Sequence, residues 1–460
     1  MYHSKNILIS RKDPLFAWCD DIAHKANNLY NAALFRERQM MSAVRKTDIH
    51  DLTDNELEVM SEFEWTNHYL PDDKQKLIPR SGTLSYTSLE CMMKLNKNPD
   101  YFCAGLPRQT AQQVLKTAVQ DISSFFESVK SYNQNPGRFT GRPELPKYKH
   151  KKGVCSFIVT NQDCVIHKNK KHRYTAKLPL TKKAARLGRN VSGKFIQLNV
   201  TPKNNVYQLS FIFDDEADAP EAADTAERVI AIDLGVDNLM AVANNIGAEC
   251  LLFKGGAAKS ANHYFNKMSA RIQSEQTIGS TDKFVPTKRY YRLLQKRNNR
   301  INDFMLKCGK RLITWCVEKR IDTIVIGENK FWKQECSMGG TGNQNFVQIP
   351  FERLKWIIAY SAERLGIHVI YQEESYTSKA SFLDRDKIPV YSRNSKEEYK
   401  FSGVREKRGL YRSSDGTKIN ADLNGSANIL RKALPDAFKN GAEPDFRNIR
   451  TYYHPDLKLK

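Results

Sequence analysis

The sequence predicts a multidomain α+β protein, and three observations support this fold class. With 460 residues, 40% of them hydrophobic, the chain is long enough for two or three domains with separate cores. Helical periodicity dominates the first third, short alternating segments occupy 155–213, and buried strands alternate with helices after residue 228. The acidic, alanine-rich segment 214–228 is typical of a linker. We therefore place the main domain boundary there.

The N-terminal half combines long helices with a small β region. A short strand at 5–13 precedes a stretch, 14–46, whose apolar residues recur at helical spacing. Residues 106–132 predict an amphipathic helix, because their apolar side chains share one face. A basic loop with Pro and Gly follows at 133–153, and the alternating segments of 155–213 predict a small β-barrel or sheet.

The C-terminal half has an α/β pattern that ends in a loose basic tail. Its predicted elements are antiparallel strands at 229–236, 238–244 and 249–255, a basic helix at 288–320, a strand at 322–330, a helix at 350–366, a third core strand at 367–375 and a last helix from 420.

The charge and the cysteines restrict the function classes. A net charge of +22 and a pI of about 9.5 favour a polyanionic partner, nucleic acid first, over a merely soluble basic protein. The nine cysteines are scattered without a C-x-x-C pair, which fits free thiols in a reducing compartment. No uncharged apolar stretch approaches the roughly 18 residues of a membrane helix. We expect a cytoplasmic protein without a membrane partner.

Three carboxylates stand where predicted elements of the α/β half end or begin. Asp233 interrupts the apolar run "VIAIDLGV", Glu328 ends "TIVIGE", and Asp422 lies near the start of the last helix. Each alone has a common structural explanation, as a turn former, a solvated strand end or a helix cap. Strand tips and a helix start can converge in space, however, and the small residues 425–427 would let that helix approach the sheet closely. Together the three carboxylates predict one acidic site.

Converging carboxylates repel one another, so the site requires cations. Mg²⁺ prefers hard oxygen ligands, and two ions about 3.5–4 Å apart activate a water, hold a scissile phosphate and stabilise the leaving oxygen. Asp233, Glu328 and Asp422 are therefore the predicted catalytic residues and metal ligands of a two-metal phosphodiester hydrolase.

The motifs that contain these residues resemble a known family. "IDLGVDNLMAV", "IVIGENK" and "DLNGSANIL" are similar to the three RuvC nuclease motifs of the TnpB proteins encoded by transposons and of the miniature type V CRISPR effectors. The resemblance extends over 229–435, with a weaker match at 106–130 and 142–153. It implies an RNase H-like (RuvC) domain, preceded by a helical recognition lobe inserted into a wedge-like β-barrel. It also assigns Asp233, Glu328 and Asp422 as the magnesium ligands.

On this resemblance the domains receive definite bounds. They are a wedge-like barrel at 1–15 and 143–213, a recognition lobe at 16–142, the acidic linker at 214–228, the RuvC domain at 229–435 and the basic tail at 436–460. Many relatives carry a four-cysteine zinc ribbon before the third motif. Here the corresponding insertion, 376–417, contains no cysteine, so we predict a degenerate loop for target loading without zinc.

Basic residues with aromatic neighbours mark the expected nucleic-acid contacts. The predicted set is Lys147, Tyr148, Lys149, Lys151, Lys152, Lys170, Lys171, Arg173, Arg292, Lys296, Arg297 and Arg300. For any single lysine a solvated surface position is the simpler interpretation, and the helix at 288–320 has the alternative role of merely crossing the sheet.

The sequence thus predicts an RNA-guided DNA endonuclease. It would recognise a short motif beside its target, pair a guide RNA with one DNA strand and cut at one magnesium-dependent site. The expected partners are guide RNA and double-stranded target DNA, bound by a monomer in a prokaryotic ribonucleoprotein that joins the nucleoid. Two alternatives stay open: a guided DNA-binding repressor or targeting factor that does not cut, and an unguided RNase H-like enzyme acting on branched DNA.

Overall fold

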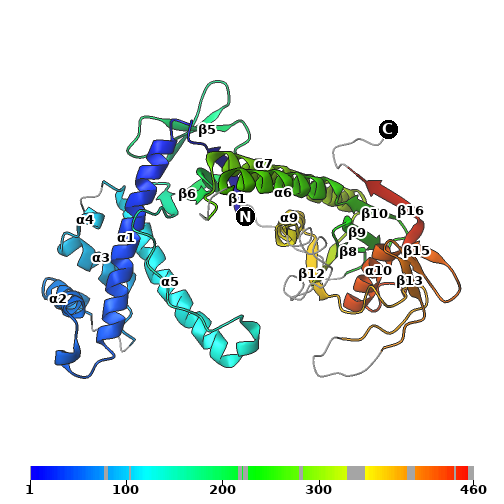
Figure 1. The fold of residues 1–460 in the computed structure, drawn as a ribbon, viewed down its shortest axis with the longest axis horizontal. Helices are drawn as coiled ribbons and strands as arrows, with labels where there is room; N and C mark the ends of the chain where they lie inside the picture. Colours follow the sequence, from blue (N-terminus) through cyan, green and yellow to red (C-terminus); the bar gives the residue numbers. More distant parts are fainter. Residues whose placement is uncertain are drawn as a thin grey trace. The chain divides into compact units, whose positions relative to one another are not determined.

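The chain forms two compact units, Met1–Ala217 and Asp218–Lys460, here called unit 1 and unit 2 (Figure 1). The computed structural model describes residues 2–76, 81–102, 105–215, 220, 226–278, 283–328, 348–390, 399–439 and 442–453. The boundary between the units falls inside the acidic segment 214–228, most of which lies outside the described residues.

The helices of unit 1 pack around the long helix α1. They are α1 (Phe16–Ala43), α2 (Asp54–His68), α3 (Tyr86–Leu95), α4 (Pro99–Phe102) and α5 (Arg108–Gln134), with single 3₁₀ turns at Ile49–Asp51, Asp72–Lys74 and Pro136–Arg138. α1 contacts both α2 and α5. Residues 35–100 show no usable resemblance to the family, yet local capping fixes two helices there. Thr53 and Glu56 form a capping box at α2, and Ser85 caps α3.

The strands of unit 1 form two antiparallel sheets. One has the order β1-β7-β6-β2, made of β1 (Tyr2–Ile9), β2 (Phe157–Thr160), β6 (Lys194–Lys203) and β7 (Val206–Asp214). The other joins β3 (Val165–Lys168), β4 (Tyr174–Lys177) and β5 (Ala184–Gly188). Among the described residues no closed barrel is found, so the predicted barrel is not confirmed. β1 and β2 are sheet edges that do not pair with each other, and helices cover the buried face of this sheet instead.

Unit 2 is built on a mixed sheet of order β12-β11-β8-β9-β10-β16. β8, β9 and β10 are antiparallel neighbours, as the sequence predicts, while β11 lies parallel to β8 and β12 parallel to β11. The bounds are β8 (Val229–Leu234), β9 (Asn238–Asn244), β10 (Glu249–Lys254), β11 (Thr323–Glu328), β12 (His368–Glu373) and β16 (Asp445–Tyr452).

Helices cover both faces of this sheet. Ile230 and Ile232 of β8 share a core with α7 and α9, whereas Val229 and Ala231 share one with α10. Alternate residues of a strand point to opposite faces, so Asp233 belongs to the α10 face. The helices are α6 (Gly256–Thr277), α7 (Lys288–Glu318), α9 (Phe351–Glu363) and α10 (Ala421–Ala433). No described helix combines the length and the apolar character that crossing a bilayer requires.

A small antiparallel sheet stands immediately before α10. It consists of β13 (Val404–Lys407), β14 (Leu410–Arg412) and β15 (Lys418–Asn420). β13 and β14 lie inside the predicted insertion 376–417, and β15 directly follows it.

Two predictions for unit 2 are wrong in detail. β12, predicted as a core strand, is the edge of the sheet, and its residues are exposed or half-buried. The tail 436–460 is not loose throughout, because β16 pairs in parallel with β10. The Tyr452 ring stacks on Phe253 at a centroid distance of 4.7 Å, and this apolar contact anchors a segment whose charge alone suggested solvent.

A buried acid lies in the helical core of unit 1. Glu37 of α1 is fully buried and accepts a hydrogen bond of 3.0 Å from the Leu84 backbone N–H, while its Oε1 has no partner. Burial raises the pKa of Glu37 from 4.5 to about 7. Because the folded pKa lies above the unfolded one, the stability this group contributes is fully present below pH 4.5. It is lost as the pH rises through 7.

We expect Glu37→Gln to remove this pH dependence. Between pH 5 and pH 8 the wild-type unit 1 should lose about 3 kcal/mol more stability than the variant. That difference corresponds to roughly 6–12 °C in melting temperature for a domain of this size. Thermal unfolding followed by circular dichroism measures it. Glu58→Gln, at an exposed position of α2, should keep the wild-type pH profile. Identical profiles for wild type and Glu37→Gln would contradict the assignment.

Candidate active site

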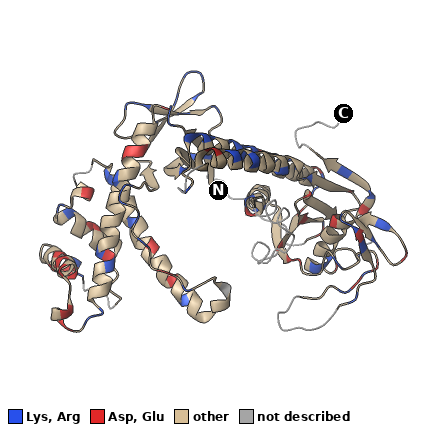
Figure 2. Ribbon diagram, in the orientation of Figure 1, with Lys and Arg blue, Asp and Glu red and all other residues tan. Residues whose placement is uncertain are grey.

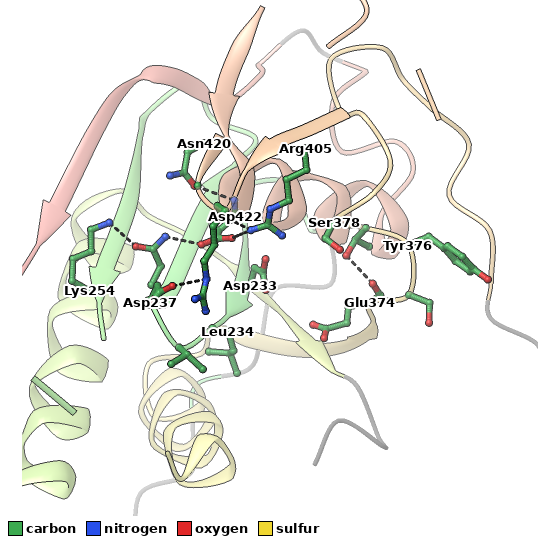
Figure 3. A pocket seen from close by; sticks show the side chains of 17 residues that line it. Asp233, Leu234, Asp237, Lys254, Glu374, Tyr376, Ser378, Arg405, Asn420 and Asp422 are labelled. Atoms are coloured by element: carbon green, nitrogen blue, oxygen red, sulfur yellow. Dashed lines mark hydrogen bonds and ion pairs between the residues drawn. The ribbon is translucent and has the colours of Figure 1, made fainter. Parts of the chain in front are cut away.

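A pocket of about 620 Å³ opens at the C-terminal end of β8 (Figure 3). The loop from β8 to β9, the segment after β12, the β13–β14 turn and the start of α10 all line it. Parallel β11 and β12 end on the same side of the sheet as β8, because parallel strands finish at a common edge. The sheet topology therefore gathers side chains that lie far apart in the sequence.

Asp233 stands in the floor of this pocket. Its carboxylate faces α10 at Gly425, where an added Cβ would lie 2.7 Å from Oδ2. Among the described residues no hydrogen bond or ion pair to the Asp233 side chain is found, and Figure 3 shows it pointing into the open space. Burial first, and then the charges of Glu374 and Asp422, raise the pKa of Asp233 well above its usual value.

Asp422 enters the same pocket from the first turn of α10. Asn420 is the cap of this helix, accepting hydrogen bonds from the backbone N–H groups of Asp422 and Leu423 at 3.0 and 3.2 Å. The Asp422 carboxylate is thus free of a capping role. It accepts hydrogen bonds from Asn238 Nδ2 at 2.6 Å and from an Arg405 Nη at 3.0 Å.

Small residues bring α10 onto the sheet, as the sequence predicts. Ser426 Oγ donates to the Ala231 carbonyl at 2.7 Å and accepts from the Ala243 N–H at 3.0 Å, so one hydroxyl bridges β8 and β9. Together with Gly425 beside Asp233, this contact sets the spacing between the two aspartates.

Glu328 is not brought into the pocket. It ends β11 as predicted, but it is not among the lining residues. The buried Lys355 of α9 places its Nζ 3.7 Å from Glu328 Oε1 and 3.0 Å from Glu352 Oε1. In the part of the chain that the structure describes, no three His, Cys, Asp or Glu side chains are grouped to hold one metal ion. The structure therefore places Asp233 and Asp422 together and leaves Glu328 beside a lysine.

Glu374 lines the pocket but was not among the site residues predicted from the sequence. It directly follows β12, and its Oε2 is buried without a hydrogen-bond partner. Burial is the largest cause that raises the pKa of Glu374 to about 7, with nearby Glu373 and Glu328 adding to it and Lys355 opposing it. The signal was present in the sequence, because "YQEES" ends a predicted strand as "VIGE" does. Nothing there distinguished Glu374 from Glu373.

Basic side chains from the small sheet form the rim. Arg405 donates to the Arg408 carbonyl at 2.6 Å as well as to Asp422, and Arg408 pairs with Asp237 at 2.7 Å. Asp237 also pairs with Lys259. The acidic floor therefore lies beneath guanidinium groups.

The donor set of the pocket fits a divalent cation. Glu374 Oε2 is buried without a hydrogen-bond partner, and Asp233 has an opposing charge nearby, Arg405, but no hydrogen bond among the described residues. Burying carboxylates in this way is costly. Hard carboxylate oxygens are the ligands Mg²⁺ prefers. Asp233 and Asp422 are the residues that would hold it.

The predicted nucleic-acid contacts of unit 1 lie on its surface. Lys149 is held by Asn31 through its backbone, and its ammonium lies 3.6 Å from the centre of the Tyr30 ring. Lys147 pairs with Glu144 at 2.6 Å, and Arg38 lies over the exposed Tyr148 ring. The remaining members of the set in this unit are exposed: Lys151, Lys152, Lys170, Lys171 and Arg173.

On α7 the predicted contacts separate into two kinds. Arg292, Lys296 and Arg300 are exposed and four residues apart, so they share one face of the helix. Figure 2 shows Lys and Arg gathered along the α6–α7 pair. Arg297 is used internally instead, donating to Asn262 Oδ1 at 2.8 Å and to the Gln348 carbonyl at 2.7 Å.

Comparisons with known proteins agree with the motifs. A family model described as a probable transposase matches residues 212–333, which include Asp233 and Glu328. A second, described as the Cas12f1-like TNB domain, matches 351–429, which include Glu374, Arg405 and Asp422. A "TnpB-like protein ORF457" of Acidianus two-tailed virus is 28% identical over 214 residues. That match covers 45% of this chain and 42% of the viral protein, less than half of its length.

Two solved structures are similar at low identity. The mini-RNA-guided endonuclease Cas-phi3 matches with a TM-score of 0.46 and 10% identity, over 94% of this chain and 92% of that one. A Cas12f1–sgRNA–target DNA complex matches with a TM-score of 0.32 and 12% identity, over 94% and 100%. The two family models and the viral relative confirm the resemblance predicted from the motifs: this chain is similar to TnpB-like proteins over its first two motifs and to the Cas12f1-like TNB domain over its third.

Proposed function

We propose that this chain is an RNA-guided DNA endonuclease whose single cutting site is the pocket of Asp233 and Asp422. It pairs a guide RNA with the target strand, recognises a short flanking motif and hydrolyses DNA phosphodiesters. The sheet of unit 2 with α10 would be its RuvC domain, and the sheets of unit 1 its wedge region. The family resemblance and the net charge of +22 support guide RNA and target DNA as partners.

One observation carries the proposal. Asp233 is a carboxylate placed in a protein floor with no partner among the described residues, and a second carboxylate and a guanidinium face the same space. An uncompensated buried charge destabilises a fold by several kcal/mol. A protein with only a binding role gains nothing from that arrangement, whereas a site for cations and phosphate does.

The residues have separate roles in hydrolysis. Magnesium, when bound, would supply Lewis acidity and a water nucleophile at neutral pH. Asp233 and Asp422 would hold that ion, and we keep Glu328 in the proposed set although it pairs with Lys355. Arg405 lies on the pocket wall and donates hydrogen bonds to anionic oxygen, so it is placed to bind a phosphate oxygen of the scissile strand.

A second candidate is a guided DNA-binding protein that does not cut. The pairing of Glu328 with Lys355 and of Asp422 with Arg405 favours it, because protein cations then neutralise carboxylates that a nuclease reserves for metal.

Cleavage assays separate the two candidates. Guide-loaded wild type should cut matched duplex DNA in Mg²⁺. Asp233→Asn and Asp422→Asn should each lose about a thousandfold in rate, since metal-ion catalysis supplies several kcal/mol. Binding of the same duplex, measured by filter retention, should stay unchanged. Asp436→Asn, at an exposed carboxylate paired with Lys439, is the control with wild-type cleavage. Wild type that binds tightly but never cuts would establish the binder.

The exposed cations of α7 give a second test. Replacing Arg292, Lys296 and Arg300 together by Gln should weaken binding to an RNA–DNA heteroduplex and flatten its dependence on salt. The slope of log K against log salt should fall by roughly 2–3, because each lost phosphate contact removes 0.7–0.9. Lys439→Gln with Arg447→Gln, two exposed cations elsewhere in unit 2, should leave the slope unchanged. An equal effect from both variants would show that only net charge matters.

A further inference from the structure

We infer that Glu374 is a further metal-binding carboxylate of this site, acting with Asp233 on the side of the pocket that borders β12. The inference rests on the proposed function, because it assigns a residue to the same cation site. Neither the RuvC-like motifs nor the spacing of the sequence assigns this role to Glu374.

The sheet places Glu374 at the pocket by strand register. β11 and β12 run in parallel with Glu328 opposite Glu373, so the two strands end together. Glu374 is the next residue, and its side chain lines the pocket with Asp233. Glu328, one position earlier on the neighbouring strand, does not line it.

A glycine creates the space that this carboxylate occupies. An added Cβ at Gly327 would lie 2.7 Å from Glu374 Oε2 and 2.8 Å from Ile429 Cδ1. Any larger residue at 327 would displace the carboxylate or α10. The end of β11 is therefore shaped to admit a side chain from β12, and the oxygen admitted there has no hydrogen-bond partner.

The neighbouring Glu373, in contrast, has a structural role. Glu373 accepts a hydrogen bond of 2.7 Å from Lys432 Nζ and one of 2.6 Å from the Ser375 N–H. Its charge is compensated within the protein. For Glu374 no hydrogen bond or ion pair to the side chain is found within the described ranges, although Lys355 and Lys432 lie near enough to act on it electrostatically. Of these two adjacent carboxylates, Glu373 is paired within the protein, whereas Glu374 keeps an unpaired oxygen that could bind a metal ion.

A titration with Mn²⁺ alone tests the inference. The full chain, freed of nucleic acid, is titrated while electron paramagnetic resonance measures free Mn²⁺. We expect binding by wild type, none by Asp233→Asn, and an affinity at least about tenfold weaker for Glu374→Gln, as for other residues that support a metal site. Glu363→Gln, an exposed carboxylate of α9, should bind as wild type. Metal-free Glu374→Gln should melt no lower than wild type, because a buried carboxylate without a partner is removed.

The outcomes distinguish a failure of the Glu374 assignment from a failure of the proposed nuclease site. If wild type does not bind Mn²⁺, the proposed nuclease site itself fails. If wild type binds, Asp233→Asn does not, and Glu374→Gln binds as wild type, the role of Glu374 is overturned and the nuclease site stands. Should Glu374→Gln fail to fold, Glu374→Asp decides by the same titration. It keeps the charge and withdraws the oxygens by one methylene, so an unchanged affinity overturns the inference.

Discussion

A carboxylate withdrawn from water is the constraint on which unit 2 depends. Asp233 sits on the sheet face covered by α10, where burial and the charges of Glu374 and Asp422 outweigh the opposing charge of Arg405. Apolar packing on both faces of the sheet offsets the free-energy cost of burying this carboxylate. Val229 and Ala231 lie against Ala427 and Ile429 on the same face as the acid. The strand β8 therefore supplies both core residues and the carboxylate of the pocket floor.

The carboxylates in and near the pocket fall into two groups, those that pair with a cationic side chain and those that do not. Asp422 is held by Asn238 and Arg405, and Glu328 lies beside Lys355. For the side chains of Asp233 and Glu374 no hydrogen bond or ion pair is found among the described residues, although Arg405 acts on Asp233 and Lys355 and Lys432 act on Glu374 electrostatically. The raised pKa values of Asp233 and Glu374 reflect this arrangement. Under the proposed function, carboxylates on the floor and guanidinium groups on the rim would orient a metal-bound phosphate.

Much of the fold follows from local pattern, and the remainder depends on pairing over long distances. The apolar runs before Asp233 and Glu328 predict β8 and β11, and the periodicity of 106–132 predicts most of α5. The strand β16 was missed because Arg447 and Arg450 interrupt its few apolar residues, and only the partner β10 shows that Tyr452 faces the core. Arg297 was predicted to contact nucleic acid like its neighbours on α7, because a periodic pattern does not reveal its hydrogen bonds to Asn262 and Gln348. Glu374 was missed because two adjacent glutamates are equivalent until strand register assigns one to the pocket.

The small sheet before α10 is joined to that helix without any intervening loop. β15 ends at Asn420, which is itself the cap of α10, and Asp422 comes two residues later. Arg405 of β13 holds the same aspartate from the other end of this sheet. Because no flexible linker separates the β13–β14 hairpin from α10, a displacement of the hairpin would also move the Asp422 carboxylate. A ligand bound to the hairpin would therefore influence the position of that carboxylate.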